Sequence, residues 1–401
     1  MVTKRNPDDE RLSVLILIDW YCPSTAANGT TRLVDGMVAR LGNDVFFSII
    51  TQDRGRSQTT SCPRMKPGQW SPFHNSRVFS LAPQGLSLPQ LRTLLNDVNP
   101  DVVYLTSFFS PLTRKFLIWR KMKLIPNIPC VLGPSGEFSP GALRIKSLRK
   151  RAYILGVSRM GLYDDLVWHA SWSGEERDIR AAWPRPIKVR IAPALTPSPC
   201  TSPEIRNLQK SPFTVRFVFL SRISPMKNLR YAIELLGELR GQVLFDIYGP
   251  LEDSDYWATC LRSIQKLPRH ITVRSLGSVD NSKVVDTLRD YHFFLMPTLG
   301  ENFGYAIFEA LAAGCPPIIS DRTPWNTLRE HGVGWDIPLQ DQEQWRRVLQ
   351  DCVDMPNARY RQMAEAAQAF ARDWSTSSRD IRQNFDLFRD AVSTAHDSKL
   401  H

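Results

Sequence analysis

Two glutamates, Glu301 and Glu309, raise the first chemical question in this sequence. They stand in GENFGYAIFEALAAGCPPIIS, residues 300–320, which contains no other charged residue. On one continuous helix, a spacing of eight residues would separate the carboxylates by about 80° in azimuth and roughly 12 Å along the axis. A single small ligand would not easily meet both groups in that arrangement. We therefore expect Glu301 on a loop and Glu309 on the helix that follows.

The glycines around the glutamates indicate where that helix begins and ends. Gly300 and Gly304 give the backbone freedom before the helical pattern YAIFEALAAG. Gly314 followed by Pro316 is typical of a helix end. The free amides of the helix N-terminus then lie beside Glu301 and form an anion site, at which a diphosphate could dock.

Glu309 is the one charged residue between Tyr305 and Gly314, so we expect this helix to be mostly buried. A buried carboxylate needs donors that offset the loss of its hydration. Ribose hydroxyls are suitable donors, and so is a neighbouring side chain that uses Glu309 as structural glue. The residues alone leave both interpretations open.

Two cations follow another expected strand, in FVFLSRISPMKNLRYAIELL. The strand at 215–221 leads into a loop that carries Arg222 and Lys227, and Asn228 is the expected N-cap of the next helix. Two cations fixed at the carboxyl end of a strand suit a diphosphate that gains negative charge as its sugar departs. The alternative is that both are ordinary surface cations in a chain with 51 lysines and arginines.

Short apolar segments alternate with longer helical patterns along the chain, which is typical of strand-helix-strand units around parallel sheets. The pattern predicts an α/β protein of two doubly wound halves. The proline-rich segment 192–212 is the expected connector, with a boundary near residue 200. A ligand normally binds beyond the carboxyl ends of such strands, so we expect the halves to share a cleft. The expected strands are residues 13–19, 45–51, 101–107, 129–133 and 168–171, then 215–221, 243–248, 271–277, 293–297 and 316–320.

Charge narrows the classes of partner. The formal charge of +11 suits nucleic acid, an anionic membrane surface or a phosphorylated ligand. Basic residues concentrate at 114–123 and 143–151, both expected to be helical, and a solvated basic face is the alternative to a membrane-lying helix. Nucleic-acid binding would require cations interleaved with aromatic residues, or a recognition helix, and the sequence shows neither.

Hydropathy and cysteine usage indicate a compartment. No segment approaches the roughly 18 consecutive apolar residues of a membrane span. The seven cysteines are scattered and never form CxxC, so we expect neither a disulfide framework nor a zinc site. A cytoplasmic protein fits these observations, with the basic runs at the inner face of a membrane.

These motifs together resemble those of a known enzyme family. The segment 300–324 is similar to the E-x7-E motif of the family 4 retaining glycosyltransferases, SRISPMKN at 221–228 to their GR-x4-KG, and VLFDIYGP at 243–250 to their L-x-I-x-G segment. The resemblance covers residues 211–340 strongly and the first half more loosely. It implies the GT-B fold, in which two Rossmann-like domains face each other across a cleft.

For this chain the resemblance implies an acceptor-side domain over residues 1–200 and a nucleotide-sugar domain over 201–375. A C-terminal helix within 376–401 would cross back to the first domain. By the same resemblance, Glu301 binds the donor hexose and Glu309 the ribose. Arg222 and Lys227 are implied to hold the diphosphate, in place of a metal ion. Further implied donor-binding residues are Asn302, Phe303, Gly304 and Gly249.

The first half resembles the family at weaker motifs. IDWYCPSTAANGTTRL is similar to the family's opening strand, loop and helix, with Gly29 where two glycines are common. GPSGEFSPGAL carries Ser135 where many relatives have a histidine, which leaves the acceptor-side contact unassigned. WHASWSGEE resembles H-A-T-x3-E through His169 and Glu175. His169 either faces the acceptor as a catalytic residue or is a satisfied structural histidine, and both interpretations stay open.

The resemblance implies a retaining transferase that moves a hexose from a UDP- or GDP-linked sugar to a hydroxyl of a glycan or lipid-linked acceptor, in surface polysaccharide or glycoconjugate assembly. The implied transfer needs no metal ion and no cofactor, and the departing phosphate takes the acceptor's proton. The basic runs make an anionic membrane surface an expected partner. The alternative is a non-catalytic nucleotide-sugar-binding subunit that supports a partner enzyme, and an epimerase of the same fold is a third reading.

Overall fold

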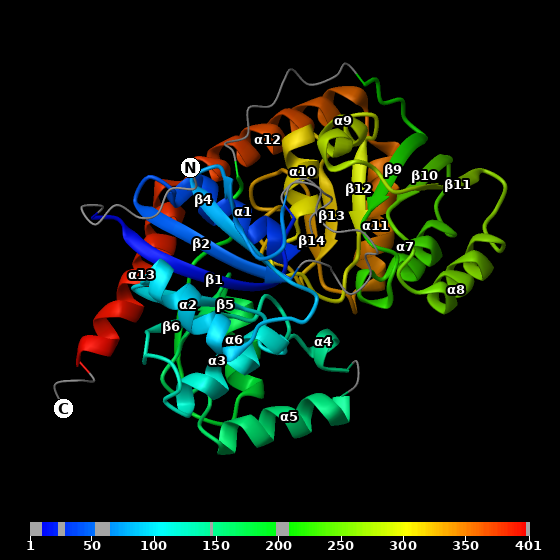
Figure 1. Cartoon of the computed structure of the whole chain (residues 1–401). Coiled ribbons are helices and arrows are strands. Elements are labelled where there is room, and N and C mark those ends of the chain that lie inside the picture. Colours follow the sequence, from blue (N-terminus) through cyan, green and yellow to red (C-terminus); the bar gives the residue numbers. More distant parts are fainter. Residues whose placement is uncertain (1–9, 23–28, 53–64, 145–146, 198–207, 398–401) are drawn as a thin grey trace. The chain divides into compact units, whose positions relative to one another are not determined.

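The computed structural model describes residues 10–22, 29–52, 65–144, 147–197 and 208–397 (Figure 1). The chain divides into two compact units. The first is Met1–Ser198 together with Ser377–His401, and the second is Pro199–Thr376. The boundary expected near residue 200 lies outside the described residues.

The first unit is built on a sheet with the strand order β3-β4-β2-β1-β5-β6-β7-β8. All neighbouring pairs are parallel except β3 with β4. The strands are β1 (Leu12–Trp20), β2 (Val45–Gln52), β3 (Trp70–Phe73), β4 (Ser76–Leu81), β5 (Val102–Thr106), β6 (Cys130–Gly133), β7 (Val167–Ala170) and β8 (Lys188–Ile191). The helices are α1 (Gly29–Leu41), α2 (Leu88–Val98), α3 (Pro111–Lys121), α4 (Pro140–Arg144), α5 (Ser147–Arg159), α6 (Ser173–Ala182) and α13 (Ser378–Asp397).

The central strands are buried runs because helices cover both faces of a parallel sheet. In β1, LSVLILIDW, the residues from Ser13 to Ile18 are all buried. The sequence pattern missed β3, β4 and β8, because their charged or proline residues interrupt the apolar runs. In β4 the buried Arg77 lies over the Trp70 ring at 4.4 Å and pairs with Asp97 at 3.2 Å, so a cation occupies a core position.

Helix α13 completes the first unit, although it lies at the far end of the chain. The Phe388 ring contacts Phe47 and Tyr104 in edge-to-face geometry. Asn384 Nδ2 donates a hydrogen bond of 2.7 Å to the carbonyl of Pro193. These contacts bury α13 against the sheet face that carries Phe47 and Tyr104.

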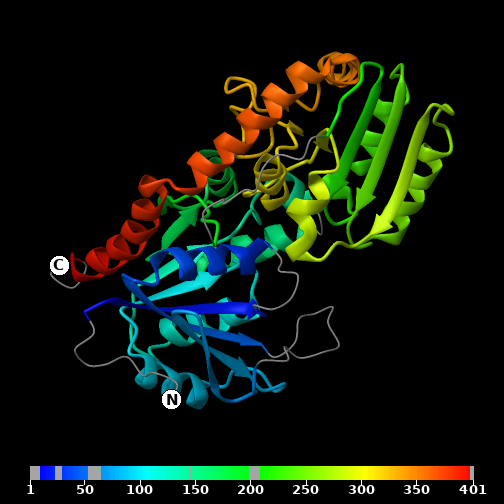
Figure 2. The same ribbon diagram turned by 90° about the horizontal axis from the view of Figure 1, so that it is seen from above.

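The second unit has a fully parallel sheet with the order β11-β10-β9-β12-β13-β14. Figure 2 shows β9, β10 and β11 side by side as the green to yellow-green arrows. Helix α7 packs against α8 and α11, and α10 packs against α9 and α12. The strands are β9 (Thr214–Leu220), β10 (Gln242–Tyr248), β11 (Ile271–Gly277), β12 (Phe293–Met296), β13 (Pro317–Ser320) and β14 (Trp335–Ile337). The helices are α7 (Leu229–Leu236), α8 (Ser254–Ile264), α9 (Val284–Leu288), α10 (Tyr305–Ala313), α11 (Gln342–Asp354) and α12 (Asn357–Ser375), with short 3-10 turns η1 (Pro225–Lys227) and η2 (Asn281–Lys283).

Each sheet has one point at which the strand order reverses. In the first unit the chain moves outward from β1 through β2 and β4, then returns to place β5 on the other side of β1. In the second unit β12 returns to the other side of β9. Loops that leave the carboxyl ends of strands at such a switch point diverge and leave a crevice, which is the usual ligand site of a doubly wound sheet.

One disulfide departs from the sequence expectation. Cys22 is disulfide-bonded, and its partner lies outside the described residues. Cys130, Cys260, Cys315 and Cys352 are free and buried. None of the helices in the described part of the chain is long and apolar enough to cross a membrane.

Candidate functional site

Lys227 and Glu301 form an ion pair at the switch point of the second sheet. Lys227 ends η1, just after β9, and Glu301 lies on the loop between β12 and α10. Each side chain is 11% exposed. Water screens such a pair weakly, and removal of one partner would leave the other charge buried and uncompensated. The sequence predicted both residues to be in one ligand site, and the structure brings their side chains into contact.

Hydrogen bonds to one carbonyl hold the two loops together. The carbonyl of Met226 accepts from the Leu299 amide at 2.8 Å and from Thr298 Oγ1 at 3.1 Å. The Glu301 amide donates to the carbonyl of Arg322 at 2.9 Å. Lys227 and Glu301 therefore project from backbone that is fixed on both sides, which gives the pair a defined geometry without a ligand.

The expected loop and helix are confirmed. Helix α10 begins at Tyr305 and ends at Ala313, and its C-cap residue Gly314 has a φ of 70°. Gly304, at the N-cap, has a φ of 79°, and a Cβ there would lie 2.7 Å from Ile307 Cδ1, so this position requires glycine. Trp325 Nε1 donates to the Phe303 carbonyl at 2.5 Å, which fixes the loop just before the helix.

Glu309 lies inside α10 and is 7% exposed, as the apolar composition of the helix predicts. Asn302 is half-buried on the loop that carries Glu301. The first amides of α10 follow directly, and amides in the first turn of a helix lack partners within the helix. The Glu301 carboxylate, the loop amides and the helix N-terminus therefore lie together at the N-terminal end of α10.

Arg222 takes a different position from Lys227. Its guanidinium is half-exposed and pairs with Glu252, with 2.6 Å between Nη1 and Oε1. Two loops meet at this point, because the Ile223 amide donates to the Pro250 carbonyl at 2.9 Å. Gly249 has a φ of 143°, and a Cβ there would lie 1.8 Å from the Ser221 carbonyl oxygen, so glycine allows this close approach.

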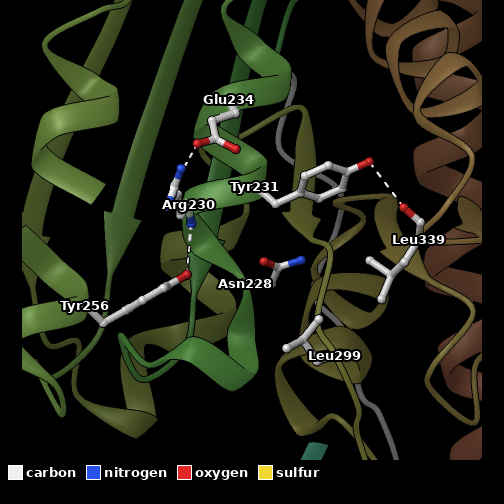
Figure 3. Close-up of a pocket in the computed structure, with 7 residues that line it drawn as sticks. All are labelled: Asn228, Arg230, Tyr231, Glu234, Tyr256, Leu299 and Leu339. Carbon is white, nitrogen blue, oxygen red and sulfur yellow. Dashed lines mark hydrogen bonds and ion pairs between the residues drawn. The ribbon is translucent and has the colours of Figure 1, made fainter. Parts of the chain in front are cut away.

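A cavity of about 330 Å³ adjoins these loops (Figure 3). Asn228 is the N-cap residue of α7, as predicted, but its φ is 55° and its side chain makes no capping hydrogen bond. That side chain instead lies between Tyr231 and Leu299 in the cavity (Figure 3). The cavity is lined by Asn228, Arg230, Tyr231, Glu234, Tyr256, Leu299 and Leu339, and none of these is a predicted donor-binding residue.

Four positions of the first unit that the sequence analysis named lie apart from the Lys227–Glu301 pair. Gly29 is the first residue of α1, and a Cβ there would meet no atom within 4 Å, so packing does not require glycine. Ser135 has a φ of 51°, and its buried Oγ has no hydrogen-bond partner among the described residues. Glu175 accepts from the amides of Gly136 and Ser171, both at 2.7 Å, and burial raises the pKa of its carboxyl group to about 7.

His169 is the fourth position, and both of its ring nitrogens are engaged inside the unit. Nε2 lies 2.7 Å from the Ala192 carbonyl, so it carries the proton and donates. Nδ1 lies 2.8 Å from the Tyr104 hydroxyl, which therefore donates to it. Burial lowers the pKa of the imidazole to about 4. These contacts fit the structural interpretation of His169 and leave no ring nitrogen for a ligand.

The sequence analysis did not select the residues around a second, larger cavity in the first unit. This cavity, of about 500 Å³, is lined by residues that include Asp19, Gln52, Ser107 and Glu137. Each lies at the carboxyl end of a strand or shortly after it, but they are far apart in sequence and match no motif. The signal that could have found them is their shared position at the carboxyl ends of predicted parallel strands.

The described residues contain no group of three or more His, Cys, Asp or Glu side chains arranged to hold a metal ion.

The match to a known protein family falls within the second unit of this chain. Residues 204–370 match the sequence model of the family "Glycosyl transferases group 1". A phosphatidyl-myo-inositol mannosyltransferase of Mycobacterium leprae is 31% identical over 117 residues, which are 28% of this chain and 31% of that protein. A D-inositol 3-phosphate glycosyltransferase of Streptomyces scabiei is 29% identical over 174 residues, 40% of this chain and 39% of that protein. The matches thus span less than half of these relatives.

Solved structures share the fold over nearly the whole chain. Sucrose-phosphate synthase from Thermosynechococcus elongatus superposes with a TM-score of 0.69 at 13% identity, covering 96% of this chain and 100% of that one. HepE of Anabaena, solved with UDP and glucose, gives 0.64 at 17% identity, with coverage of 95% and 100%. The chain has the GT-B fold, and its residues 204–370 match the group 1 glycosyl transferases.

Proposed function

We propose that this chain is a glycosyltransferase that moves a hexose from a nucleoside-diphosphate sugar to a hydroxyl of a glycan or lipid-linked acceptor. The observation that carries the proposal is the buried Lys227–Glu301 pair at the β9/β12 switch point, within the segment that matches the family. Buried Glu309 follows on α10. A structural neighbour at 17% identity was solved with UDP and glucose, which supports a nucleotide-sugar donor.

Each group at the site has a role in this proposal. The Lys227 ammonium binds the diphosphate, and Glu301 accepts hydrogen bonds from hydroxyls of the hexose. Glu309 accepts from the ribose. The amides of Phe303 and Gly304 and the N-terminus of α10 bind the sugar or a phosphate oxygen. Asn302 and Gly249 lie on the loops that border these groups.

The proposed chemistry retains the anomeric configuration and uses no metal ion. A bond forms between the acceptor oxygen and the anomeric carbon as the bond to the phosphate oxygen breaks, on the same face of the sugar. The acceptor's proton passes to the departing phosphate. Lys227 and Arg222 stabilise the charge that develops on this leaving group. For Arg222 this requires its guanidinium to exchange the exposed Glu252 carboxylate for phosphate.

Calorimetric titration with UDP- and GDP-sugars in the presence of EDTA tests the donor site. We expect one nucleotide sugar to bind the wild-type chain and to bind at least tenfold more weakly to Lys227→Ala, Glu301→Ala and Glu309→Ala. Arg346→Ala is the matched control, because Arg346 also pairs with a carboxylate, that of Glu238, but on the exposed surface of α11. Circular dichroism of each variant monitors folding.

Transfer is then tested with the donor that binds and a panel of glycan and lipid-linked acceptors. Product formation with retained configuration supports the proposal. Binding without transfer would favour the non-catalytic subunit instead, and donor conversion without an acceptor would favour an epimerase. No binding of any nucleotide sugar would overturn the donor site itself.

We also propose that the acceptor is met at an anionic membrane surface, as in surface polysaccharide or glycoconjugate assembly. Helix α5 lies at the outer edge of the first unit (Figure 1) and has no acidic residue in SLRKRAYILGVSR. Leu148 is 83% exposed and Leu155 is 45% exposed. At about 100° per residue these leucines share one strip of the helix, with Arg149 and Arg151 on either side. An exposed apolar strip flanked by arginines suits a headgroup layer of anionic lipids.

Sedimentation with vesicles of phosphatidylcholine and phosphatidylglycerol tests this surface. Wild-type chain should bind the anionic vesicles and not vesicles of phosphatidylcholine alone. Leu148→Glu and Arg149→Glu should each weaken binding about tenfold or more. The control Leu261→Glu changes a leucine that is 42% exposed on α8 and should bind as the wild type does. Equal recovery of all variants would reject α5 as the membrane surface.

A further inference from the structure

The cavity at the start of α7 belongs to no part of the proposed donor site. It has a volume of about 330 Å³, within the range of roughly 300 to 1,000 Å³ that is typical of small-molecule sites. Its walls come from α7, α8 and the loops that carry Leu299 and Leu339 (Figure 3). Glu301 and Glu309, in contrast, lie just before and within α10, which packs against α9 and α12.

Asn228 gives this cavity a polar group that is not yet paired. Its side-chain amide lies between Tyr231 and Leu299 and makes no hydrogen bond with any of the described residues (Figure 3). Its φ is 55°, a conformation that favours glycine. The motif that residues 221–228 resemble ends in glycine at this place. The turn therefore does not require the asparagine side chain, whose amide offers one acceptor and two donor hydrogens to a ligand.

An aromatic ring and an aliphatic side chain lie on either side of that amide. The hydroxyl of Tyr231 donates to the Leu339 carbonyl at 3.3 Å, which fixes the position of the ring. Leu299 is 39% exposed. A planar ligand whose edge reaches Asn228 would have the Tyr231 ring near one face and Leu299 near the other (Figure 3). Flat aromatic ligands suit such a lining, because both of their faces are apolar.

The two charged residues of the lining neutralise each other. Arg230 Nε lies 2.7 Å from Glu234 Oε1, and the two side chains are 54% and 45% exposed. The hydroxyl of Tyr256 accepts from the Arg230 amide at 2.9 Å, so a second ring is fixed beside this pair. Because the lining has no excess charge, the cavity favours an uncharged ligand.

The cavity also adjoins the two loops that carry the donor-site ion pair. Asn228 directly follows Lys227, and Leu299 lies two residues before Glu301. The Leu299 amide donates to the Met226 carbonyl at 2.8 Å. A ligand that contacts both Asn228 and Leu299 would add a second connection between these loops. Loops that are held in place before the donor binds lose less entropy on binding it, which raises the affinity.

We propose that this cavity is an effector site for an uncharged planar ring with a hydrogen-bond donor and an acceptor side by side at one edge, the chemistry of a nucleobase. The amide of Asn228 pairs with that edge, as asparagine does with adenine in nucleic-acid complexes. Tyr231 and Leu299 contact the two faces of the ring. The bound ring restrains the loops and strengthens donor binding. Only this last step rests on the proposed function, since ring binding can be measured without a donor.

Saturation-transfer NMR with the full chain measures ring binding. The probes are adenine, cytosine and uracil, which carry neither ribose nor phosphate. Purine is the matched probe, because it is a planar ring of the same kind without the exocyclic group that completes the paired edge. UDP and GDP are present in excess, so that they compete for any base position of the donor site. We expect at least one base to bind, and purine to bind about tenfold more weakly than that base.

Asn228→Gly removes the amide and keeps a residue suited to the φ of 55°. It should weaken the base about tenfold or more, and in the absence of base it should leave donor affinity within about twofold of wild type. The matched control is Asn99→Gly, because Asn99 also has a positive φ, 43°, at the C-cap of α2 in the first unit. This control should bind the base as the wild type does. Leu299→Ala should weaken the base about fivefold, and it decides the test if Asn228→Gly does not fold.

Calorimetry measures the coupling between the cavity and the donor site. At a saturating concentration of the base, the wild-type chain should bind its nucleotide sugar about three- to tenfold more tightly. By reciprocity, the nucleotide sugar should strengthen binding of the base by the same factor. Asn228→Gly should show neither change.

The outcomes separate the cavity from the donor site. Absence of binding by all three bases, equal binding of purine, or binding that Asn228→Gly does not change would overturn the cavity as a ring site, while donor binding still stands. Base binding that leaves donor affinity unchanged would overturn the effector role. Failure of donor binding with and without base would overturn the proposed function, and loss of base binding in Asn228→Gly would then still support the ring site.

Discussion

The two switch points of this chain occupy equivalent places in their sheets but carry different chemistry. At β9/β12 a buried lysine is paired with a partly buried glutamate, beside a helix N-terminus. At β1/β5 the wall presents two carboxyl groups, an amide and aromatic rings around a cavity. The first arrangement provides a cation for a phosphate, whereas the second provides mainly hydrogen-bond acceptors. The topology thus determines where a ligand binds, and the side chains on the loops determine which ligand it is.

The switch points also differ in how their residues are distributed along the chain. In the second unit, Glu301, Phe303, Gly304 and Glu309 all come from one strand-to-helix connection. In the first unit the lining comes from segments after β1, β2, β5 and β6. A compact motif can be read from sequence, whereas a dispersed lining requires the sheet order.

The largest expected effect is that of Lys227→Ala on transfer. Loss of this cation should lower kcat/KM by about 10²- to 10³-fold, because the leaving phosphate loses a fixed positive charge. Steady-state kinetics with the donor identified by calorimetry measures the change. A fall in kcat/KM of less than tenfold would mean that the β9/β12 switch point is not the phosphate site. The contrast between the two switch points would then not hold.

A double-mutant cycle distinguishes chemistry from folding at this pair. Lys227→Ala leaves Glu301 buried without its cation, which should lower the free energy of unfolding by about 3 kcal/mol. Adding Glu301→Gln should restore most of that stability but none of the activity. Recovery of activity in the double variant would show that Lys227 acts through Glu301 and not on the donor.

The next largest effect is expected for Gly249→Ala. A Cβ there would lie 1.8 Å from the Ser221 carbonyl oxygen, in a backbone conformation with a φ of 143°. We expect the free energy of unfolding of the second unit to fall by about 3 kcal/mol or more, measured by urea denaturation. Gly277→Ala is the matched control: its φ is 74°, but a Cβ there would meet no atom within 4 Å. It should cost about 1 kcal/mol.

Particular residues show which features of the fold and of the site could be predicted from the sequence. The placement of Glu301 on a loop and Glu309 on a helix follows from glycine positions and is confirmed. The contact of Lys227 with Glu301 spans 74 residues and depends on β9 and β12 being neighbours, which periodicity does not reveal. β4 was missed because the buried Arg77 interrupts its apolar pattern. The environment of His169 depends on Tyr104 and Ala192, which are remote in sequence and follow no pattern.

A smaller effect should appear in the pH dependence of the first unit. Burial raises the pKa of Glu175 from 4.5 to about 7 in the folded chain. The folded state therefore holds a proton that the unfolded state releases, and stability should fall as pH rises from about 5 to about 7. We expect Glu175 to account for a loss on the order of 2 kcal/mol, obtained as the difference between wild type and Glu175→Gln in urea denaturation at each pH.

The difference in unfolding free energy between the wild type and Glu175→Gln separates the contribution of Glu175 from those of other titratable groups. Glu137 titrates in the same sense, and His169, whose pKa burial lowers to about 4, in the opposite one, but both are present in each protein. Glu176→Gln, in which the change falls on a carboxylate paired with Arg180 on the same helix, serves as control. If the wild type and Glu175→Gln show parallel pH profiles, the loop at Ser135 is not held by a carboxyl group that loses its proton in this range.

The smallest effect decides between the two interpretations of His169. Tyr104→Phe removes the donor to Nδ1 and leaves this buried nitrogen unpaired, which should lower the free energy of unfolding of the first unit by about 1 to 2 kcal/mol. Tyr231→Phe, which removes a half-buried hydroxyl that donates to the Leu339 carbonyl at 3.3 Å, should cost less than about 0.5 kcal/mol. If His169 has only a structural role, kcat/KM of Tyr104→Phe should stay within about twofold of wild type. A side chain that contacts no substrate contributes binding energy in neither the ground state nor the transition state. A hundredfold fall in kcat with unchanged stability would instead place His169 at the acceptor.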